Sequence, residues 1–206
     1  MDDTARRRQI LEAARQLLCH YGPHKTTVAD IARAAHVGVG SVYLEFSSKE
    51  AIIEELSSVL YDRVLSAMRG AALDRRSACA KRLQQVMTAK VRVLMEQGNT
   101  GQHARDLMHC PSPAVRAAQQ RFSRAEVGLV TELLAEGAAG GELSLFDRPE
   151  LVATTVLRAY AVFSPPWLFL EAPEQIDRAL DGMHRLVLHG LLGRQPAAAR
   201  RRKTGA

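Results

Sequence analysis

Apolar residues recur along most of this 206-residue chain at spacings of three and four positions, the period of an amphipathic helix. Alanine, leucine and arginine, which favour helices, are plentiful, and the alternation typical of strands is nearly absent. Glycine and proline mark the ends of the periodic segments. The pattern predicts an all-α fold, with helices over residues 4–20, 28–34, 39–46, 47–69, 77–97, 102–109, 111–138, 149–163 and 173–192.

The segment over residues 26–49 predicts two short helices joined by a tight turn. Thr27 is followed three positions later by Asp30, the spacing of a capping box that starts a helix. The turn contains Gly38, which allows a backbone conformation that other residues resist. A helix–turn–helix of this size places its second helix, here Val39–Phe46, in the major groove of DNA.

A set of residues stands in one register with this helix–turn–helix: Ile10, Ala14, Leu17, Gly22, Thr26, Thr27, Val28, Asp30, Ile31, Ala32, Ala35, Val37, Gly40, Ser41, Tyr43, Phe46 and Lys49. The pattern resembles the DNA-binding domain of the TetR family of bacterial transcriptional regulators. The resemblance covers roughly residues 8–56. It implies an N-terminal three-helix DNA-binding domain followed by a C-terminal helical domain for ligand binding and dimerisation.

The resemblance also implies which residues bind double-stranded DNA: Thr26, Thr27, Val39, Gly40, Ser41, Tyr43, Leu44 and Lys49. Thr27 and Lys49 lie at predicted helix N-termini, where backbone N–H groups and the helix dipole favour a phosphate. Lys49 would add a mobile charge there. Val39 is expected against a thymine methyl, and Glu45 offers an acceptor to a cytosine amine.

Three positions depart from the family pattern. Gly38 stands where a serine often caps the recognition helix, Val39 where a polar or basic residue is usual, and Leu44 where histidine is usual. The predicted recognition helix therefore offers few hydrogen-bonding groups to bases, and we expect binding through phosphate and apolar contacts. The alternative is an interaction protein whose helix–turn–helix no longer binds DNA.

The net charge of +6 lies mostly at the C-terminus. Residues 1–50 carry seven basic and six acidic side chains, whereas residues 194–206 carry five basic side chains. This tail is either a solvated end or an anchor on the DNA backbone. Arg6, Arg7 and Arg8 form either an arm that reaches a minor groove or a solvated helix start.

The expected organisation has three parts: a DNA-binding domain over residues 1–50, a ligand-binding and dimerisation domain over residues 51–193, and a basic, disordered tail over residues 194–206. Ser47 and Glu50 have the spacing of a second capping box, which predicts the start of the helix connecting the two domains.

The last two long predicted helices carry apolar stripes that a single subunit does not obviously cover. The resemblance implies that these helices pair two subunits into a homodimer, and the alternative is that the stripes belong only to the core. The stripes comprise Leu151, Thr155, Leu157, Ala161 and Val162 on one helix, and Leu180, Met183, Val187, Gly190 and Leu191 on the other.

By the same resemblance, the C-terminal domain encloses a pocket whose ligand releases the protein from a pseudo-palindromic operator. The candidate ligand-binding residues are Met87, Val91, Met95, Cys110, Phe122, Tyr160, Phe163 and Trp167. Methionine and aromatic side chains suit an adaptable cavity, so we expect an apolar or amphipathic small molecule, although the same residues also suit a plain core. Transcriptional activation is the alternative to repression.

Other classes of function find little support in the sequence. Three cysteines without paired spacing suit a reducing cytoplasm, and the chain has neither an apolar signal core nor an apolar run long enough to cross a membrane. His103, His109 and Cys110 fit no common zinc pattern. No phosphate-binding loop, nucleophile elbow or pair of catalytic carboxylates is present. We therefore expect a cytoplasmic regulator that is not an enzyme and needs no metal or cofactor.

Overall fold

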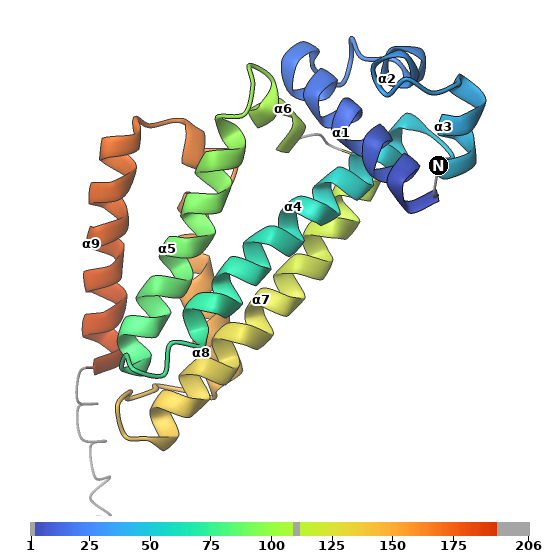
Figure 1. Cartoon of the computed structure of the whole chain (residues 1–206). Helices are drawn as coiled ribbons and strands as arrows, with labels where there is room; N and C mark the ends of the chain where they lie inside the picture. Colours follow the sequence, from blue (N-terminus) through green and yellow to red (C-terminus); the bar gives the residue numbers. More distant parts are fainter. Residues whose placement is uncertain (1–2, 109–111, 193–206) are drawn as a thin grey trace, which may run out of the picture.

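The computed structural model describes residues 3–108 and 112–192. This part of the chain contains helices joined by turns and loops, and no strands. The predicted tail over residues 194–206 and the candidates His109 and Cys110 lie outside the described residues. The α-helices are α1 (Asp3–Tyr21), α2 (Val28–Ala34), α3 (Val39–Glu45), α4 (Lys49–Ala72), α5 (Cys79–Gly98), α6 (Ala104–Met108), α7 (Pro113–Ala139), α8 (Pro149–Ala159) and α9 (Pro173–Leu192). Two short 3-10 helices, η1 (Tyr160–Phe163) and η2 (Trp167–Phe169), follow α8. The predicted all-α fold is confirmed (Figure 1).

The first three helices form a small head around a hydrophobic core that is separate from that of the body (Figure 1). The centre of this core comprises Ile10, Ala14, Leu18, Ile31, Val42 and Phe46. Each of these residues is at most 4% exposed. The core also takes in Ile52 and Ile53 from the start of α4, and Ala104, Leu107 and Val115 from α6 and α7. Residues far along the chain therefore complete the head.

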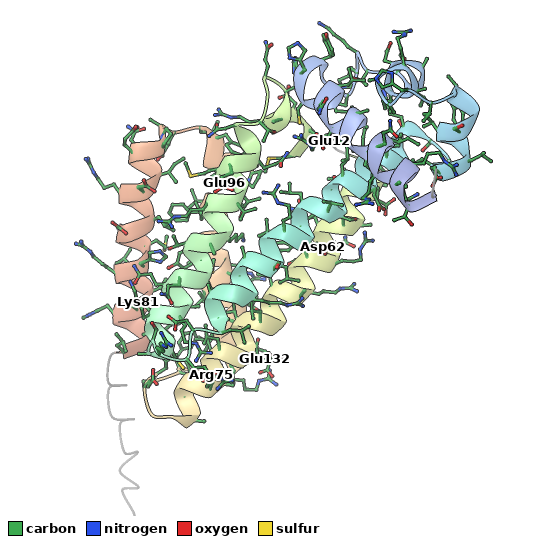
Figure 2. The ribbon with its side chains drawn as sticks, in the orientation of Figure 1. Glu12, Asp62, Arg75, Lys81, Glu96 and Glu132 are labelled. Atoms are coloured by element: carbon green, nitrogen blue, oxygen red, sulfur yellow. The ribbon has the colours of Figure 1, made fainter. Side chains whose placement is uncertain are left out.

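The body is a helical bundle in which α4 and α7 run side by side away from the head (Figure 1). Helix α5 packs against α4, α8 packs against α7, and α9 packs against α5. The second hydrophobic core lies between them and includes Val64, Met68, Leu83, Val86, Leu134, Val152 and Leu180. The charged residues labelled in Figure 2 are all exposed, as expected for amphipathic helices that bury one face.

The two predicted capping boxes have different outcomes. At α2, the Thr27 Oγ1 accepts a hydrogen bond from the Asp30 N–H at 3.2 Å, and the Asp30 carboxylate accepts one from the Thr27 N–H at 3.1 Å. At α4 the predicted cap is wrong by one residue, because Ser48 rather than Ser47 is the N-cap. Its Oγ accepts the N–H of Ala51, a residue that has no side-chain acceptor to return the second bond.

Helix α8 ends earlier than predicted. The periodicity continues to Phe163, but the α-helix ends at Ala159 and the last turn tightens into η1. Ser164 precedes Pro165 and takes an extended conformation, which a proline imposes on the residue before it. The chain therefore leaves the helical path through a 3-10 turn, as many helix ends do.

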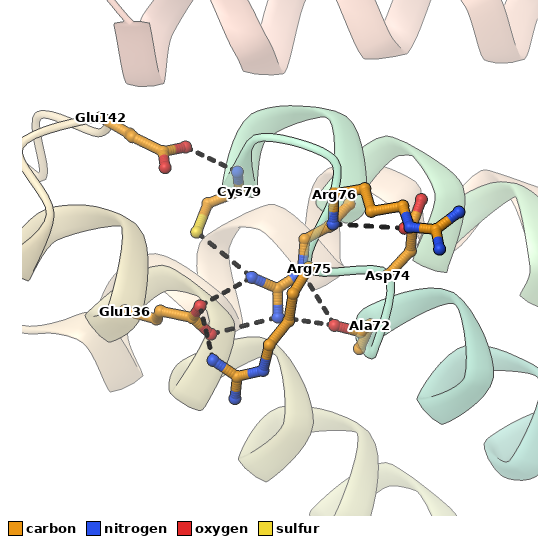
Figure 3. A network of polar contacts seen from close by, with 8 residues as sticks. Ala72, Asp74, Arg75, Arg76, Cys79, Glu136 and Glu142 are labelled. Atoms are coloured by element: carbon orange, nitrogen blue, oxygen red, sulfur yellow. Dashed lines mark hydrogen bonds and ion pairs between the residues drawn. The ribbon is translucent and has the colours of Figure 1, made fainter.

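A buried arginine joins three helices at the end of the body farthest from the head (Figure 3). Arg82 of α5 donates through Nε to the backbone oxygen of Ala72, the last residue of α4, at 2.8 Å. Its Nη1 and Nη2 donate to the two carboxylate oxygens of Glu136 on α7, at 2.8 and 3.1 Å. These bonds lower the pKa of Glu136 and raise that of Arg82. One side chain thus satisfies a helix-end carbonyl and ties α4, α5 and α7 together.

A second buried network joins α5, η1 and α9 through His184. The Thr88 Oγ1 donates to the backbone oxygen of Gln84 at 2.9 Å, so it accepts from the His184 Nε2–H at 3.1 Å. The His184 Nδ1 then accepts from the Tyr160 hydroxyl at 2.6 Å. The arrangement requires a neutral imidazole protonated on Nε2. Burial lowers the pKa of His184, and burial also raises that of Tyr160.

The folded state should lose stability in mild acid because of this histidine. The unfolded chain binds a proton near the ordinary histidine pKa of 6.5, whereas folded His184 resists protonation. The His184 contribution is therefore fully present above 6.5 and is lost as the pH falls from there through the lowered folded pKa. Urea unfolding at about pH 7.5 and about pH 5 measures this difference. His184→Gln keeps a hydrogen-bond acceptor and donor but does not titrate, so it should reduce the difference in unfolding free energy between the two pH values. An equal pH dependence in the variant and the original protein would contradict the role given to His184.

Candidate DNA-binding surface and ligand cleft

Helix α3 presents one face to the core and the other to solvent. Val42 and the following Phe46 are 1% and 4% exposed, whereas Tyr43 and Leu44 are 54% and 82% exposed. Val39 and Gly40 are exposed beside them. We call Val39, Gly40, Tyr43 and Leu44 the recognition face. The predicted DNA contact Ser41 lies at its edge and is half-buried.

The recognition face carries one hydroxyl and otherwise only apolar atoms on its side chains. A major-groove surface of this kind can contact thymine methyl groups and one phosphate or base edge, but it cannot form the bidentate pairs that Arg, Asn or Gln make with purines. The geometry therefore agrees with the expectation of a mainly apolar reading surface.

Two of the predicted DNA contacts have structural roles instead. Thr26 is 2% exposed, and its Oγ1 donates to the backbone oxygen of Gly22 at 2.9 Å, so it lies behind the surface. The Lys49 Nζ is not a mobile charge, because it donates to the backbone oxygens of Pro23 and Thr26 at 2.7 and 3.2 Å. Lys49 thus fixes the loop before α2 to the start of α4. A pattern match cannot distinguish such a residue from a phosphate ligand.

The expectation that Glu45 reads a cytosine is also wrong. Its carboxylate lies 2.7 Å from the Arg6 Nη2, and the Arg7 Nη1 donates to the Glu45 backbone oxygen at 2.7 Å. The Arg7 guanidinium also lies 4.1 Å from the centre of the Phe46 ring. Arg6 and Arg7 are therefore neither a minor-groove arm nor a solvated helix start. They clamp the N-terminal half of α1 onto the C-terminal end of α3.

Few cations of the head remain available for phosphates. Besides the clamp and Lys49, Arg15 pairs with Glu12 and Arg33 pairs with Asp30. Among the described lysines and arginines of the head, this leaves Arg8 and Lys25 exposed and without an ion pair. They are the cations from which a salt-dependent backbone contact can come.

The body contains a cleft of about 790 Å³ between α7, α8 and the loop that follows α8. Its volume lies within the usual range for small-molecule sites. The apolar part of its wall includes Leu94, Phe122, Leu157, Pro166 and Trp167. Of the candidate ligand residues, Phe122 and Trp167 line it, so the loop over residues 164–167 is part of its wall.

The other described ligand candidates do not line this cleft. Met87, Val91, Tyr160 and Phe163 are each buried in the body core, and Met95 packs against that core. The structure thus places these residues in the core, the position that the alternative interpretation gave them. Methionine and aromatic residues at helical spacing fill a core as readily as they line a cavity.

Four charged residues of the cleft escaped the sequence prediction: Lys90, Arg116, Glu126 and Arg158. Lys90 and Glu126 form an ion pair of 2.7 Å, and each side chain is only 7% exposed. The sequence did hold a signal, because Lys90 lies on the same helical face as Met87 and Leu94, both core residues. A charge at a core position of an amphipathic helix indicates either a buried pair or a site.

A chain of contacts leads from the cleft to the head. Next to the cleft wall, the ring of Phe169 packs on Gly98 at the end of α5 so closely that a Cβ there would collide with it. The Arg105 guanidinium of α6 lies 5.0 Å from the centre of the same ring. In the turn between these helices, Gly101 leaves room only for hydrogen against the Cys19 backbone of α1, and the His103 N–H donates to the Cys19 oxygen at 2.7 Å.

The two apolar stripes of the last long helices have different positions. On α9, Leu180 and Leu191 are buried and Met183 and Val187 pack against the body core, whereas Gly190 is exposed, so most of this stripe is covered within one subunit. Most of the stripe predicted on α8 and η1 faces solvent, except Leu157, which packs against the body core and lines the cleft. Leu151 and Val162 are 45% and 51% exposed, with Thr155 and Ala161 exposed between them.

The fold and the exposed helix–turn–helix can now be compared with known proteins. The family model of the bacterial regulatory proteins, tetR family, matches residues 10–56, which span the head and the first turns of α4. The head of this chain is therefore similar to that of the TetR family of transcriptional regulators. This confirms the resemblance seen in the sequence.

Individual relatives agree with the family match. The HTH-type transcriptional repressor KstR2 of Mycobacterium tuberculosis is 30% identical over 122 residues, which are 59% of this chain and 58% of KstR2. A solved structure from Shewanella sp. PV-4, described as a tetR-family transcription regulator, is 25% identical and covers 92% of this chain and 99% of its own, with a TM-score of 0.64. FadR of Bacillus subtilis, solved in complex with stearoyl-CoA, has the same fold, with 19% identity, coverage of 88% and 97%, and a TM-score of 0.70.

These relatives are named as transcriptional regulators, a role without catalysis, which supports a regulator rather than an enzyme. Within the described residues, no group of three or more histidine, cysteine or acidic side chains could hold a metal ion. His103 pairs instead with Asp106 at 2.7 Å. No helix in the described part is long and apolar enough to span a membrane.

Truncating the recognition face should abolish most DNA affinity without unfolding the head. Leu44→Ala and Tyr43→Ala should each weaken operator binding about tenfold, because each removes a major-groove contact but no core contact. Fluorescence anisotropy on a selected operator measures the effect, and circular dichroism checks the fold. Leu73→Ala is the matched control, since Leu73 is 70% exposed at the far end of α4. Equal affinities of the Leu44 and Leu73 variants would refute this assignment.

The two kinds of cation in the head should respond differently to mutation. Lys49→Ala should lower the free energy of unfolding by about 1 kcal/mol, since two backbone oxygens lose a charged donor, and should weaken binding to all DNA sequences alike. Lys25→Ala should leave stability unchanged and reduce the slope of log affinity against log salt by about one. Paired thermal unfolding and salt titrations separate these cases. A Lys49 variant that keeps full stability, or a Lys25 variant that keeps its salt slope, would contradict the two roles.

Proposed function

We propose that this chain is a homodimeric, cytoplasmic repressor of the TetR family that leaves a pseudo-palindromic operator when an apolar or amphipathic small molecule binds in its body. Residues 1–50 form the DNA-binding part and residues 51–193 the ligand-binding and dimerisation part of this proposal. The observation that carries it is the exposed recognition face, supported from behind by a core that also includes residues of α4, α6 and α7.

DNA binding would rest on shape and apolar contact. The N-terminus of α2, capped by Thr27, supplies backbone N–H groups to a phosphate, and Tyr43 supplies a hydroxyl. Lys25 adds charge near that helix start. Leu44 and Val39 then discriminate thymine from other bases by contact with its methyl group. Because only a few cations are available, the affinity would depend weakly on salt for a DNA-binding protein.

Dimerisation would use the solvent-facing side of α8 and η1. Leu151 and Val162 give that side two exposed apolar side chains, and Thr155 and Arg158 lie between them on the same face. A two-fold contact through one such face is self-complementary, which is the usual form of a symmetric dimer. The two heads would then read half-sites related by the same two-fold axis.

Release would follow from the contacts between the cleft and α1. A ligand pressed against Trp167 acts on the segment that contains Phe169, whose ring is wedged between Gly98 and Arg105. The turn beyond Gly98 is fixed to Cys19 by a backbone hydrogen bond and by close packing at Gly101. Displacement of the ring would therefore tilt the head and change the distance between the two recognition helices of a dimer.

The effector class is supported by the mixed character of the cleft. An apolar wall beside charged side chains suits a molecule with a hydrocarbon or aromatic body and a polar end. FadR of Bacillus subtilis was solved with stearoyl-CoA, which is amphipathic. That ligand belongs to FadR, and for this chain it supports only the general class.

The function can be tested by footprinting the full-length protein, at fixed salt, on DNA flanking its own gene and on sites selected from random DNA. We expect protection with two-fold symmetry and half-sites about one DNA turn apart, or a multiple of it. A panel of fatty acids, aromatic acids and sugars added to the complex should then remove protection only with amphipathic compounds. Absence of protection on both DNA sets would refute the repressor and favour an interaction protein with a degenerate helix–turn–helix. Protection that strengthens with ligand, with increased transcription, would favour an activator.

A further inference from the structure

The cleft in the body has a charged floor that the proposed function does not explain. Lys90 of α5 and Glu126 of α7 meet there at 2.7 Å, each with a side chain only 7% exposed. The Lys90 Nζ also lies 5.8 Å from the centre of the Phe122 ring. Glu126 and Phe122 therefore hold the Lys90 ammonium group in place, next to the apolar part of the cleft wall.

Such a pair contributes little to folding. The desolvation of two charges offsets most of their attraction, so apolar residues of similar size often stabilise a bundle as well or better. The rest of the α5 face around Lys90 is apolar, with Met87 and Leu94 one turn away on either side. A lysine in this position is more useful as a preplaced cation beside a cleft than as part of the core.

The charges lining the cleft are unequal in sign. Three cations, Lys90, Arg116 and Arg158, face one carboxylate, Glu126, and no other acidic residue lines the cleft within the described part of the chain. The side chain of the exposed Arg158 makes no ion pair or hydrogen bond with any residue in the described part of the chain. Because Glu126 neutralises only Lys90, the charge of the exposed Arg158 still attracts an anion to the cleft.

We infer that the cleft binds an amphipathic acid, with its carboxylate on Lys90 and Arg158 and its apolar body against Leu94, Phe122 and Trp167. Glu126 is a placeholder: it neutralises Lys90 in the empty cleft and yields that position to the ligand. The exchange keeps Lys90 paired throughout, and Glu126 must turn into the open space of the cleft so that its own carboxylate is not left buried without a partner. The inference rests on the proposed function, since it names the chemical class of the effector for the same cleft.

The first test compares three probes that share one alkyl chain: dodecanoate, dodecanol and dodecylamine, each below its micelle-forming concentration. Calorimetric titration of the full-length protein should give dodecanoate an affinity at least about tenfold above that of dodecanol, the usual gain from a charged hydrogen bond. Dodecylamine should bind weakest. Equal binding of acid and alcohol, preference for the amine through Glu126, or no binding of any probe would each overturn the inference.

Variants then identify the residues. Glu126→Gln should tighten dodecanoate binding, because it removes the competing carboxylate while keeping the shape. The double variant Lys90→Met/Glu126→Leu, which replaces the pair without stranding a charge, should lower acid affinity about tenfold and leave dodecanol unchanged. Should that variant fold poorly, Arg158→Gln tests the same point from the exposed rim, with Arg124→Gln as the matched control on the exposed surface of α7. Weaker acid binding by Glu126→Gln would refute the placeholder role.

Operator footprints distinguish this inference from the proposed function. A protein that protects its operator but ignores dodecanoate contradicts the acid-binding cleft and leaves the regulator intact. A protein that binds dodecanoate tightly through Lys90 but protects no DNA contradicts the repressor and supports the cleft.

Discussion

Helix α4 belongs to both hydrophobic cores, as α7 does, and the first core is joined to the second through these two helices. Helix α4 has 24 residues, about 36 Å, and contributes Ile52 and Ile53 to the head and Val64 and Met68 to the body. A straight helix that is packed at both ends cannot tilt at one end alone. Any rearrangement of the body that moves α4 therefore moves the head, and Arg82 fixes its far end by binding the Ala72 oxygen.

Three buried polar networks in the body differ in how completely they are satisfied. The buried polar groups of Arg82 and His184 have hydrogen-bond partners on neighbouring elements, so both residues hold these elements together. Lys90 has one carboxylate and one ring as neighbours, beside open space that can hold more. Satisfied networks hold helices together, whereas a pair at the edge of a cleft can exchange partners. Buried polar residues of the body therefore differ in role: Arg82 and His184 join helices, whereas Lys90 lies at a cleft where its partner can change.

The fold was predictable from the sequence because helix periodicity and terminal signals are local. The ends of α1 and α9, the capping box at Thr27 and the family of the head all follow from such signals. The site was less predictable, since the roles of Glu45, Lys49 and Thr26 depend on partners distant in sequence or on burial. The same holds for the cleft. Apolar residues are the usual sign of a ligand site, whereas the role of Lys90 depends on a partner that lies 36 positions away in the sequence.

The clamp between Arg6, Arg7 and Glu45 has a consequence for the evolution of the surface of α3. The clamp binds the C-terminal end of α3 through Glu45. The outward-facing residues of α3 take no part in this contact. Positions 39, 40, 43 and 44 can therefore change their chemistry without disturbing the scaffold. A duplicated copy of this chain could acquire a different exposed surface on α3 by drift at these four positions alone, while the rest of its fold stayed unchanged.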